Sequence, residues 1–254
     1  MRSSSATLPE IVALFGPTGV GKTAIALELA DLLRKRGEDP VAIGADALQV
    51  YEGLQVLTGA ATAEERSRLE HRLVGFVPVT EKFDVGQYMS LAHSEIDAAL
   101  DAGRRPIVVG GTGLYLRAAL ADLSLEKAAP GEESELWSGE TRHPTVLVGL
   151  TMDRDQLYER IERRVEEIVA GGAEAEVRAA EAAGPSHTAR KALGFDELLA
   201  GDIVALKKRS RNYARRQLAW MRKMAGLAEI DVTAMSAADA ATAIARILPR
   251  GKAP

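Results

Sequence analysis

Short apolar runs alternate with amphipathic stretches along the first half of the chain. Each run leads into glycine-rich or polar sequence, a pattern that is typical of buried strands. We predict strands at 11–15, 41–43, 73–77 and 107–109. Between them, apolar residues recur at helical spacing, which predicts helices at 23–36 and 86–101 and from Leu114 onward.

The second half of the chain predicts another buried strand at 145–150 and a last one at 228–232. Further helices are expected at 155–170, 173–183, 188–199 and 202–224, followed by a closing Ala-rich helix. Strands that alternate with helices predict an α/β fold, with a doubly wound, mainly parallel sheet flanked by helices and a helical C-terminal part. We expect a single domain over 1–254. Residues 124–144 lack periodicity and are rich in Glu, Gly, Pro and Ser, so we expect a surface connection there.

Composition excludes several classes of protein. Hydrophobic residues make up 46% of the chain and charged residues 27%, which is ordinary globular usage. No apolar run approaches the roughly 20 residues that a bilayer span needs, and residues 1–9 lack the apolar core of a signal peptide. The chain has no Cys and four scattered His, which argues against disulfides, a thiolate nucleophile or a structural zinc. We therefore expect a cytoplasmic protein that does not associate with membranes.

One segment carries a basic excess although the formal net charge of the chain is -4. It contains no acidic residue and holds eight cations: Lys207, Lys208, Arg209, Arg211, Arg215, Arg216, Arg222 and Lys223. Helical spacing places Lys208, Arg211, Arg215 and Arg222 on one face. Leu206, Tyr213 and Trp220 recur at intervals of seven residues, on the side that we expect to face the core. Such a stripe suits the phosphate backbone of a nucleic acid, and a merely solvated helix is the alternative.

A phosphate-binding loop follows the first predicted strand. Gly16-Pro17-Thr18-Gly19-Val20-Gly21-Lys22-Thr23 fits the pattern G-x-x-x-x-G-K-[ST] between a strand and a helix. The glycines let backbone N–H groups point into one concavity, the helix N-terminus adds positive potential, and Lys22 adds a full charge. The Thr23 hydroxyl can bind Mg²⁺. This motif predicts a cradle for a di- or triphosphate within a P-loop NTPase-like fold.

The motif leaves open which phosphate it holds. A nucleoside triphosphatase needs an acidic residue at the end of an apolar strand, and a GTPase needs an Asn-Lys-x-Asp motif, but neither is evident and the only Asn is Asn212. The strand at 107–109 ends instead in Gly110-Gly111-Thr112-Gly113. Its backbone amides and the Thr112 hydroxyl suit a second wall of an anion pocket, although a simple tight turn is the alternative.

Other candidate residues follow from strand ends and helix faces. Asp46 follows an apolar strand, so its carboxylate is expected to face the cradle and to bind metal or accept a proton, unless it only caps a turn. Gln49 and Tyr51 are side chains that could read or stack on a base. Arg164 shares a helix face with Leu157 and Ile161, so it points inward. There it either pairs with a buried carboxylate or reaches a pyrophosphate.

Taken together, these blocks resemble the tRNA dimethylallyltransferases, also called tRNA isopentenyltransferases. The matching blocks span most of the chain and keep one order: Gly16-Pro17-Thr18 to Gly21-Lys22-Thr23; Asp46 to Tyr51; His71-Arg72-Leu73; Gly110-Gly111-Thr112-Gly113-Leu114-Tyr115-Leu116-Arg117; Leu157 to Arg164; Ala192-Leu193-Gly194-Phe195; and Arg211-Asn212-Tyr213-Ala214-Arg215-Arg216-Gln217-Leu218-Ala219-Trp220.

The resemblance implies a reaction and roles for these residues. The P-loop would bind the pyrophosphate of dimethylallyl diphosphate rather than ATP, and Asp46 would take a proton from the exocyclic amine of an adenine next to a tRNA anticodon. The departing pyrophosphate would be held by Lys22, Thr23, Mg²⁺, Thr112 and Arg164. Contacts to the nucleic acid would come from Gln49, Tyr51, Arg211, Arg215 and Arg216. We expect the enzyme to be a monomer.

The sequence also departs from the family pattern. Ala47 stands where relatives usually carry Ser, and Leu57-Thr58-Gly59-Ala60-Ala61 stands where they carry Gly-Thr-Ala-Lys-Pro. Bacterial members insert a helical domain that grips the anticodon stem, whereas here only the short stretch 124–144 remains. Three alternatives therefore stay open: an adenylate isopentenyltransferase acting on free AMP, ADP or ATP, a P-loop small-molecule kinase, and a weakly active RNA-binding paralogue.

Overall fold

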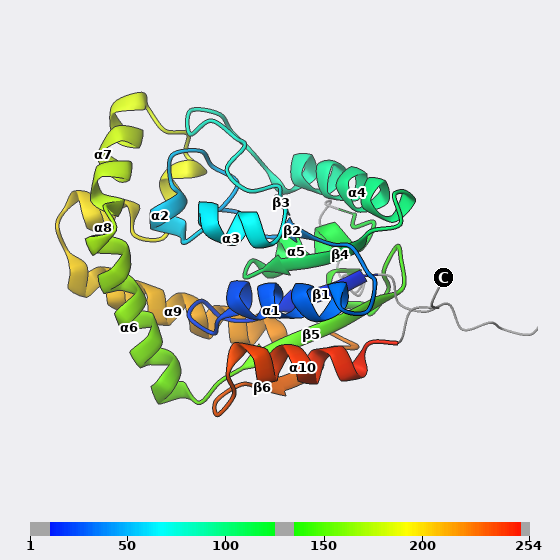
Figure 1. Ribbon diagram of the computed structural model, residues 1–254. Coiled ribbons are helices and arrows are strands. Elements are labelled where there is room, and N and C mark those ends of the chain that lie inside the picture. Colours follow the sequence, from blue (N-terminus) through cyan, green and yellow to red (C-terminus); the bar gives the residue numbers. More distant parts are fainter. Residues whose placement is uncertain (1–10, 125–134, 250–254) are drawn as a thin grey trace, which may run out of the picture.

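The computed structural model describes residues 11–124 and 135–249, and its centre is a parallel sheet. Six strands form this sheet in the order β3-β2-β4-β1-β5-β6, and each pair is parallel (Figure 1). The strands are β1 Ile11–Phe15, β2 Pro40–Gly44, β3 His71–Arg72, β4 Arg105–Gly110, β5 Thr145–Thr151 and β6 Ala228–Asp231. The predicted doubly wound α/β fold is confirmed.

Helices cover both faces of the sheet. They are α1 Lys22–Arg34, α2 Gln55–Thr58, α3 Ala63–Arg68, α4 Val85–Asp101, α5 Gly113–Leu120, α6 Arg154–Ala170, α7 Ala173–Ala183, α8 Phe195–Leu199, α9 Ile203–Met221 and α10 Ala237–Ile247. Side chains of β1 alternate between the two faces, as a strand requires. Val12 and Leu14 pack with α1 and α10, while Ala13 and Phe15 pack with α4 and α5. No helix in the described part of the chain is long and apolar enough to cross a membrane.

Two predicted elements are wrong in detail. The apolar run 73–77 is not a strand, because Leu73 (φ 58°) and Gly75 (φ 61°) turn the backbone into the left-handed region directly after β3. The single helix predicted at 188–199 is broken at Gly194 (φ 100°), so that a short 3₁₀ turn precedes α8. In both places a local backbone reversal interrupts an apolar or helical pattern.

The connection expected at 124–144 is only partly visible, because 125–134 lie outside the described residues. Its final part packs onto α5 and α9. Arg117 of α5 is 2% exposed and donates to the carbonyls of Leu136 (3.1 Å) and Glu140 (3.2 Å). The ring of Trp137 lies 4.7 Å from that of Trp220 on α9. The last part of the connection, after residue 135, is thus held in place by a buried guanidinium and a pair of aromatic rings.

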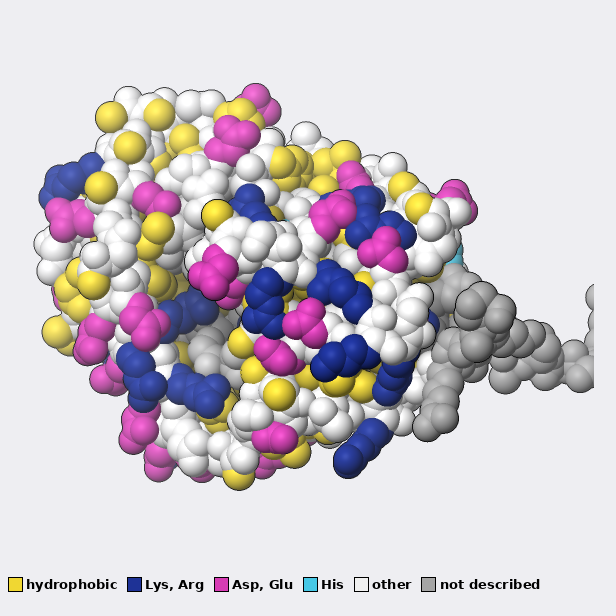
Figure 2. Space-filling model, viewed as in Figure 1, with side chains coloured by type: hydrophobic (Ala, Val, Ile, Leu, Met, Phe, Trp, Pro, Cys, Tyr) yellow, Lys and Arg dark blue, Asp and Glu magenta, His cyan; other side chains and the backbone are white. Residues whose placement is uncertain are grey.

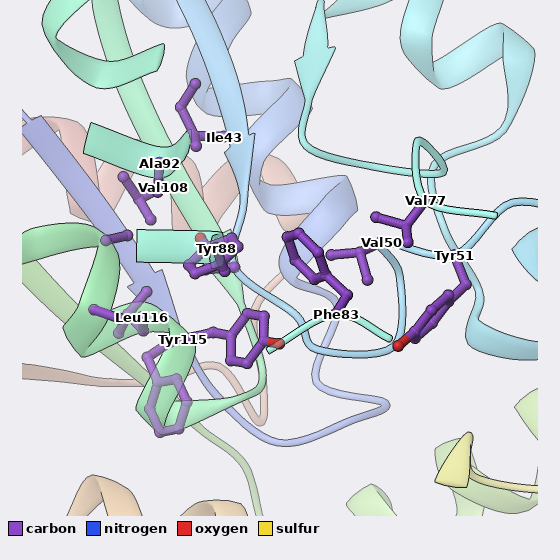
Figure 3. Packing of buried hydrophobic residues seen from close by; sticks show 14 of the residues in the cluster. Ile43, Val50, Tyr51, Val77, Phe83, Tyr88, Ala92, Val108, Tyr115 and Leu116 are labelled. Carbon is purple, nitrogen blue, oxygen red and sulfur yellow. The ribbon is translucent and has the colours of Figure 1, made fainter. Parts of the chain in front are cut away.

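The strand ends that support the site are closely packed. The hydroxyl of Tyr88 on α4 donates to the carbonyl of Gly44 at the end of β2 (2.8 Å) and its ring packs on Tyr115, as Figure 3 shows. At the end of β4, a methyl group added to Gly110 would lie 1.9 Å from the carbonyl oxygen of Ala45. Only glycine fits there, and this close approach brings the loop that carries Asp46 beside the turn after β4.

Candidate active site

A pocket opens at the carboxyl ends of β1, β2 and β4, where ligands bind in sheets of this kind. The P-loop, the loop after β2 and the turn after β4 form its floor, and α6 and α9 form its walls. Figure 1 shows α6 and α7 at this end of the sheet, and in Figure 2 a hollow edged by Lys and Arg side chains opens between them and α1.

The P-loop adopts the conformation that its glycines predict. Gly19 (φ 84°) and Gly21 (φ 99°) both occupy the left-handed region, and a methyl group at Gly19 would lie 3.0 Å from a side-chain carbon of Ile161 on α6. The loop residues on the pocket wall are Thr18, Gly19, Gly21, Lys22 and Thr23. The other loop residues, Gly16, Pro17 and Val20, do not line the pocket. The carbonyls of Gly16 (2.9 Å) and Pro17 (3.0 Å) accept from the Lys22 ammonium, and Val20 is buried.

Two cations and a carboxylate share the buried end of the pocket. Burial lowers the pKa of Lys22 to about 8 although Asp46 lies nearby, and it lowers the pKa of Arg164 as well. Burial raises the pKa of Asp46, while the N–H of Leu48 (3.1 Å), Lys22 and Arg164 favour its charged form. The other carboxylate on the wall, Glu65, is half-buried and caps α3 through the N–H of Thr62. The buried group therefore carries an excess of positive charge, which suits an anionic ligand.

Arg164 points into the pocket, as its helical spacing predicts, whereas Arg160 and Arg163 are exposed. Its Nη2 donates to the carbonyl of Thr58 (3.1 Å). The amide of Gln49 donates to the same oxygen (3.2 Å), so both side chains hold the end of α2. The next residue, Gly59 (φ 57°), lies directly under the guanidinium, since a methyl group there would be 2.0 Å from Arg164 Nη2.

The turn after β4 supports Asp46. The N–H of Gly111 favours the charged form of the Asp46 carboxylate, and the N–H of Ala47 donates to the Thr112 hydroxyl (3.2 Å). That hydroxyl also lies 3.4 Å from the hydroxyl of Tyr213. Thr112 is not among the residues that line the pocket. Its hydroxyl fixes the loop after β2 through the N–H of Ala47.

Tyr51 does not reach the pocket, which corrects its interpretation as a base-stacking side chain. It is 1% exposed, and its hydroxyl donates to that of Thr188 (2.7 Å). Its ring belongs to the core cluster that includes Val50 and Val77 (Figure 3). The isolated bridge to Val77 draws Tyr51 inward, so neither face of the ring is free for a base.

Most of the basic segment lies in α9, with Arg222 and Lys223 directly after its end, and acidic neighbours neutralise part of it. Lys207 pairs with Glu166, Arg209 with Glu197 and Arg211 with Glu162. The exposed cations are Lys208, Arg215, Arg216, Arg222 and Lys223, of which Arg215 donates to Asn212 and Arg216 lies over the ring of Tyr213. The predicted stripe is therefore weakened at Arg211 and extended at Arg216 and Lys223.

Sequence reasoning missed Gln217 as a site residue. Gln217 is 4% exposed on the inner face of α9, and it bonds both to Thr18 in the P-loop and to Gly111 in the turn after β4. The available signals were its place in the block from Arg211 to Trp220 and its spacing of seven residues from Ser210, which also lines the pocket. Periodicity likewise did not distinguish the apolar part of the wall from ordinary core: Leu57, Ile161, Val165, Ile168, Leu193 and Leu206.

The fold and the pocket define a P-loop α/β protein with a half-buried carboxylate close to two cations. Family comparison makes the assignment more specific: the chain belongs to the IPP transferase family, whose model matches residues 49–144 and 127–224. A model described as isopentenyl transferase matches residues 9–82.

Relatives and solved structures agree with this assignment. The chain is 35% identical to a tRNA dimethylallyltransferase of Rhodospirillum centenum, over 85% of this chain and 89% of the relative. It is 31% identical to one of Anoxybacillus flavithermus, over 88% and 91%. The crystal structure of a tRNA isopentenylpyrophosphate transferase from Bacillus halodurans superposes with a TM-score of 0.80 at 28% identity, covering 93% of this chain and 96% of that one.

The chain nevertheless lacks some residues that its relatives have. The alignment with the Rhodospirillum centenum protein runs over 286 positions, whereas this chain has 254 residues, so some positions of the relative have no counterpart here. The two matches of the family model meet and overlap within residues 127–144.

We predict that the affinity for inorganic pyrophosphate falls as the pH rises through about 8. Above this pH the buried Lys22 loses its proton and its positive charge, so a diphosphate is held less tightly. Titration calorimetry at about pH 7 and about pH 9 measures this change. The variant Lys22→Met controls for the ionisation of pyrophosphate itself and should lack this part of the pH dependence. An equal pH dependence in both proteins would contradict the assignment.

Proposed function

We propose that this protein transfers a dimethylallyl group from dimethylallyl diphosphate to the exocyclic amine of an adenine in tRNA, next to the anticodon, and releases diphosphate. The observation that carries the proposal is the half-buried Asp46, which lies close to Lys22 and Arg164 in the pocket of the P-loop, in a member of the IPP transferase family. The relatives cited above carry the corresponding names.

The pocket suits both halves of the donor. The diphosphate group would lie against the amides of the P-loop, with Lys22 and Arg164 providing charge. The apolar wall from α6 and α9, including Val165 and Leu206, suits a branched hydrocarbon group. A donor that joins a strongly anionic head to a small apolar tail matches this division.

The residues also suit the chemistry. The adenine nitrogen forms a bond with the allylic carbon while the bond from that carbon to the diphosphate oxygen breaks. The proton leaves the amine for the Asp46 carboxylate, and the electron pair of the broken bond goes to the diphosphate. Negative charge grows on the leaving group, so Lys22, Arg164 and the loop amides stabilise the transition state more than the bound donor. Burial raises the pKa of Asp46, which makes it a better proton acceptor.

Thr23 fits a role as a Mg²⁺ ligand together with the donor. Thr23 lines the pocket. The described residues contain no group of three or more His, Asp or Glu that could hold a metal by themselves. Mg²⁺ commonly binds through few protein ligands and several phosphate oxygens. Bound in this way, the ion would add positive charge at the diphosphate.

For the acceptor we propose tRNA, because the exposed cations of α9 include Arg215 and Arg216 beside the pocket-lining Tyr213. In this proposal the connection 124–144 stands in place of the helical insertion of bacterial relatives, and the protein acts as a cytoplasmic monomer. A free adenine nucleotide is the second candidate, favoured by the positions that the relatives have and this chain lacks. Membership of the family argues against the small-molecule kinase.

The acceptor is tested by a side-by-side transfer assay. Purified protein, Mg²⁺ and labelled dimethylallyl diphosphate are incubated with tRNA or with AMP, and label on each acceptor is counted. We expect multiple turnovers on tRNA and little transfer to AMP. Transfer to AMP with none to tRNA would reject the tRNA proposal in favour of a free nucleotide, and no transfer to either would reject the proposed reaction.

The role of Asp46 is tested by Asp46→Asn, which keeps the size of the side chain but removes the proton acceptor. We expect kcat to fall by about 100-fold or more, the range typical of a general base. Pyrophosphate affinity should not weaken, because the change removes a negative charge beside the cradle. Asp101→Asn, at the exposed end of α4, is the matched control and should behave as wild type. An Asp46→Asn enzyme with near wild-type kcat would refute this role.

A further inference from the structure

Gln217 joins the two loops that form the floor of the pocket. Its Oε1 accepts the N–H of Thr18 (2.8 Å), and its Nε2 donates to the carbonyl of Gly111 (2.7 Å). Thr18 belongs to the P-loop, whereas Gly111 belongs to the turn after β4. At 4% exposure these bonds are shielded from water, so breaking one leaves a buried polar group unpaired. One side chain of α9 thus fixes two loops that are distant in sequence.

Gly111 extends this connection to Asp46. Its N–H lies near the Asp46 carboxylate and favours the charged form of that group, while its carbonyl accepts from Gln217. A methyl group added at Gly111 would lie 2.4 Å from Gln217 Nε2 and 3.4 Å from both Asp46 Oδ2 and Lys22 Nζ. The backbone of Gly111 therefore lies among the carboxylate, the P-loop cation and the amide, and a shift of Gly111 moves the carboxylate relative to the cradle.

We propose that Gln217 is a positioning residue for the transfer reaction, setting the Asp46 carboxylate in place relative to the diphosphate cradle through Gly111 and Thr18. The proposal rests on the proposed function. Each loop keeps its own anion contacts without Gln217, so binding of diphosphate alone changes little. The reaction, by contrast, requires the amine, the allylic carbon and the leaving group in one line, and a displacement of about 1 Å lowers the rate steeply.

The turn of α9 that carries Gln217 has two different faces. Arg215 and Arg216, which precede it, are exposed, whereas Gln217 faces inward. The same turn of the helix therefore presents cations to solvent on one side and holds both loops on the other. A side chain that merely filled space at this position would need neither hydrogen bond.

The test compares Gln217→Met, which keeps the size of the side chain and removes both hydrogen bonds, with wild type. We expect kcat for transfer to fall about tenfold or more, while the Kd of inorganic pyrophosphate changes by less than about threefold. Gln156→Met, at an exposed position of α6, controls for the substitution, and Ile244→Val, on the buried face of α10, controls for lowered stability. Both controls should keep wild-type kcat per folded protein.

A double-mutant cycle with Asp46→Asn separates positioning from a structural role. If Gln217 acts through Asp46, adding Gln217→Met to Asp46→Asn lowers the single-turnover rate by less than about threefold. Multiplying losses, or wild-type kcat in Gln217→Met, would overturn the proposal. Should Gln217→Met not fold, Gln217→Glu replaces it: it can accept from Thr18 but cannot donate to Gly111, and the same fall in kcat is expected. A wild-type enzyme without transfer activity would reject the proposed function itself.

Discussion

The confinement of two cations with one carboxylate is the constraint on which the site depends. Lys22 and Arg164 lie half-buried in one pocket with Asp46 close to both, and desolvation lowers the pKa of both cations. Charged groups are costly to bury without partners, and Asp46 alone does not neutralise two cations, because Glu65, the second carboxylate on the pocket wall, also accepts from the backbone at the start of α3. The group formed by Lys22, Arg164 and Asp46 is therefore complementary to a further anion. A diphosphate supplies that charge and, as a leaving group, acquires more of it during the reaction.

The fold brings these charges together from distant parts of the chain. Lys22 begins α1, Asp46 follows β2 and Arg164 lies on α6, whose Ile161 contacts the P-loop glycine. Parallel strands collect the first two at one edge of the sheet, and the glycine at the end of β4 lets neighbouring strand ends approach closely. The C-terminal helices then close the pocket, and Gln217 ties them to both loops.

The sequence predicts most of the fold and the charged part of the site, because these leave strong local patterns. The P-loop has a fixed spacing, Asp46 ends an apolar run, and Arg164 shares a helix face with apolar residues. Side chains whose role depends on tertiary contacts are harder to interpret. Tyr51 has the chemistry to stack on a base but is drawn into the core, and Gln217 lies in a polar helix where nothing local marks its two long-range bonds. The strand predicted at 73–77 fails for a backbone reason, the positive φ of Leu73.

The most direct test of this account is the affinity of Arg164→Met for inorganic pyrophosphate, measured by titration calorimetry beside wild type. Arg163→Met, its exposed neighbour on α6, is the matched control. If both buried cations hold one anion, Arg164→Met should weaken binding by about tenfold or more, or about 1.4 kcal/mol, while Arg163→Met binds as wild type. Wild-type affinity in Arg164→Met would contradict the account, because the second cation would then serve only to hold the backbone at Thr58.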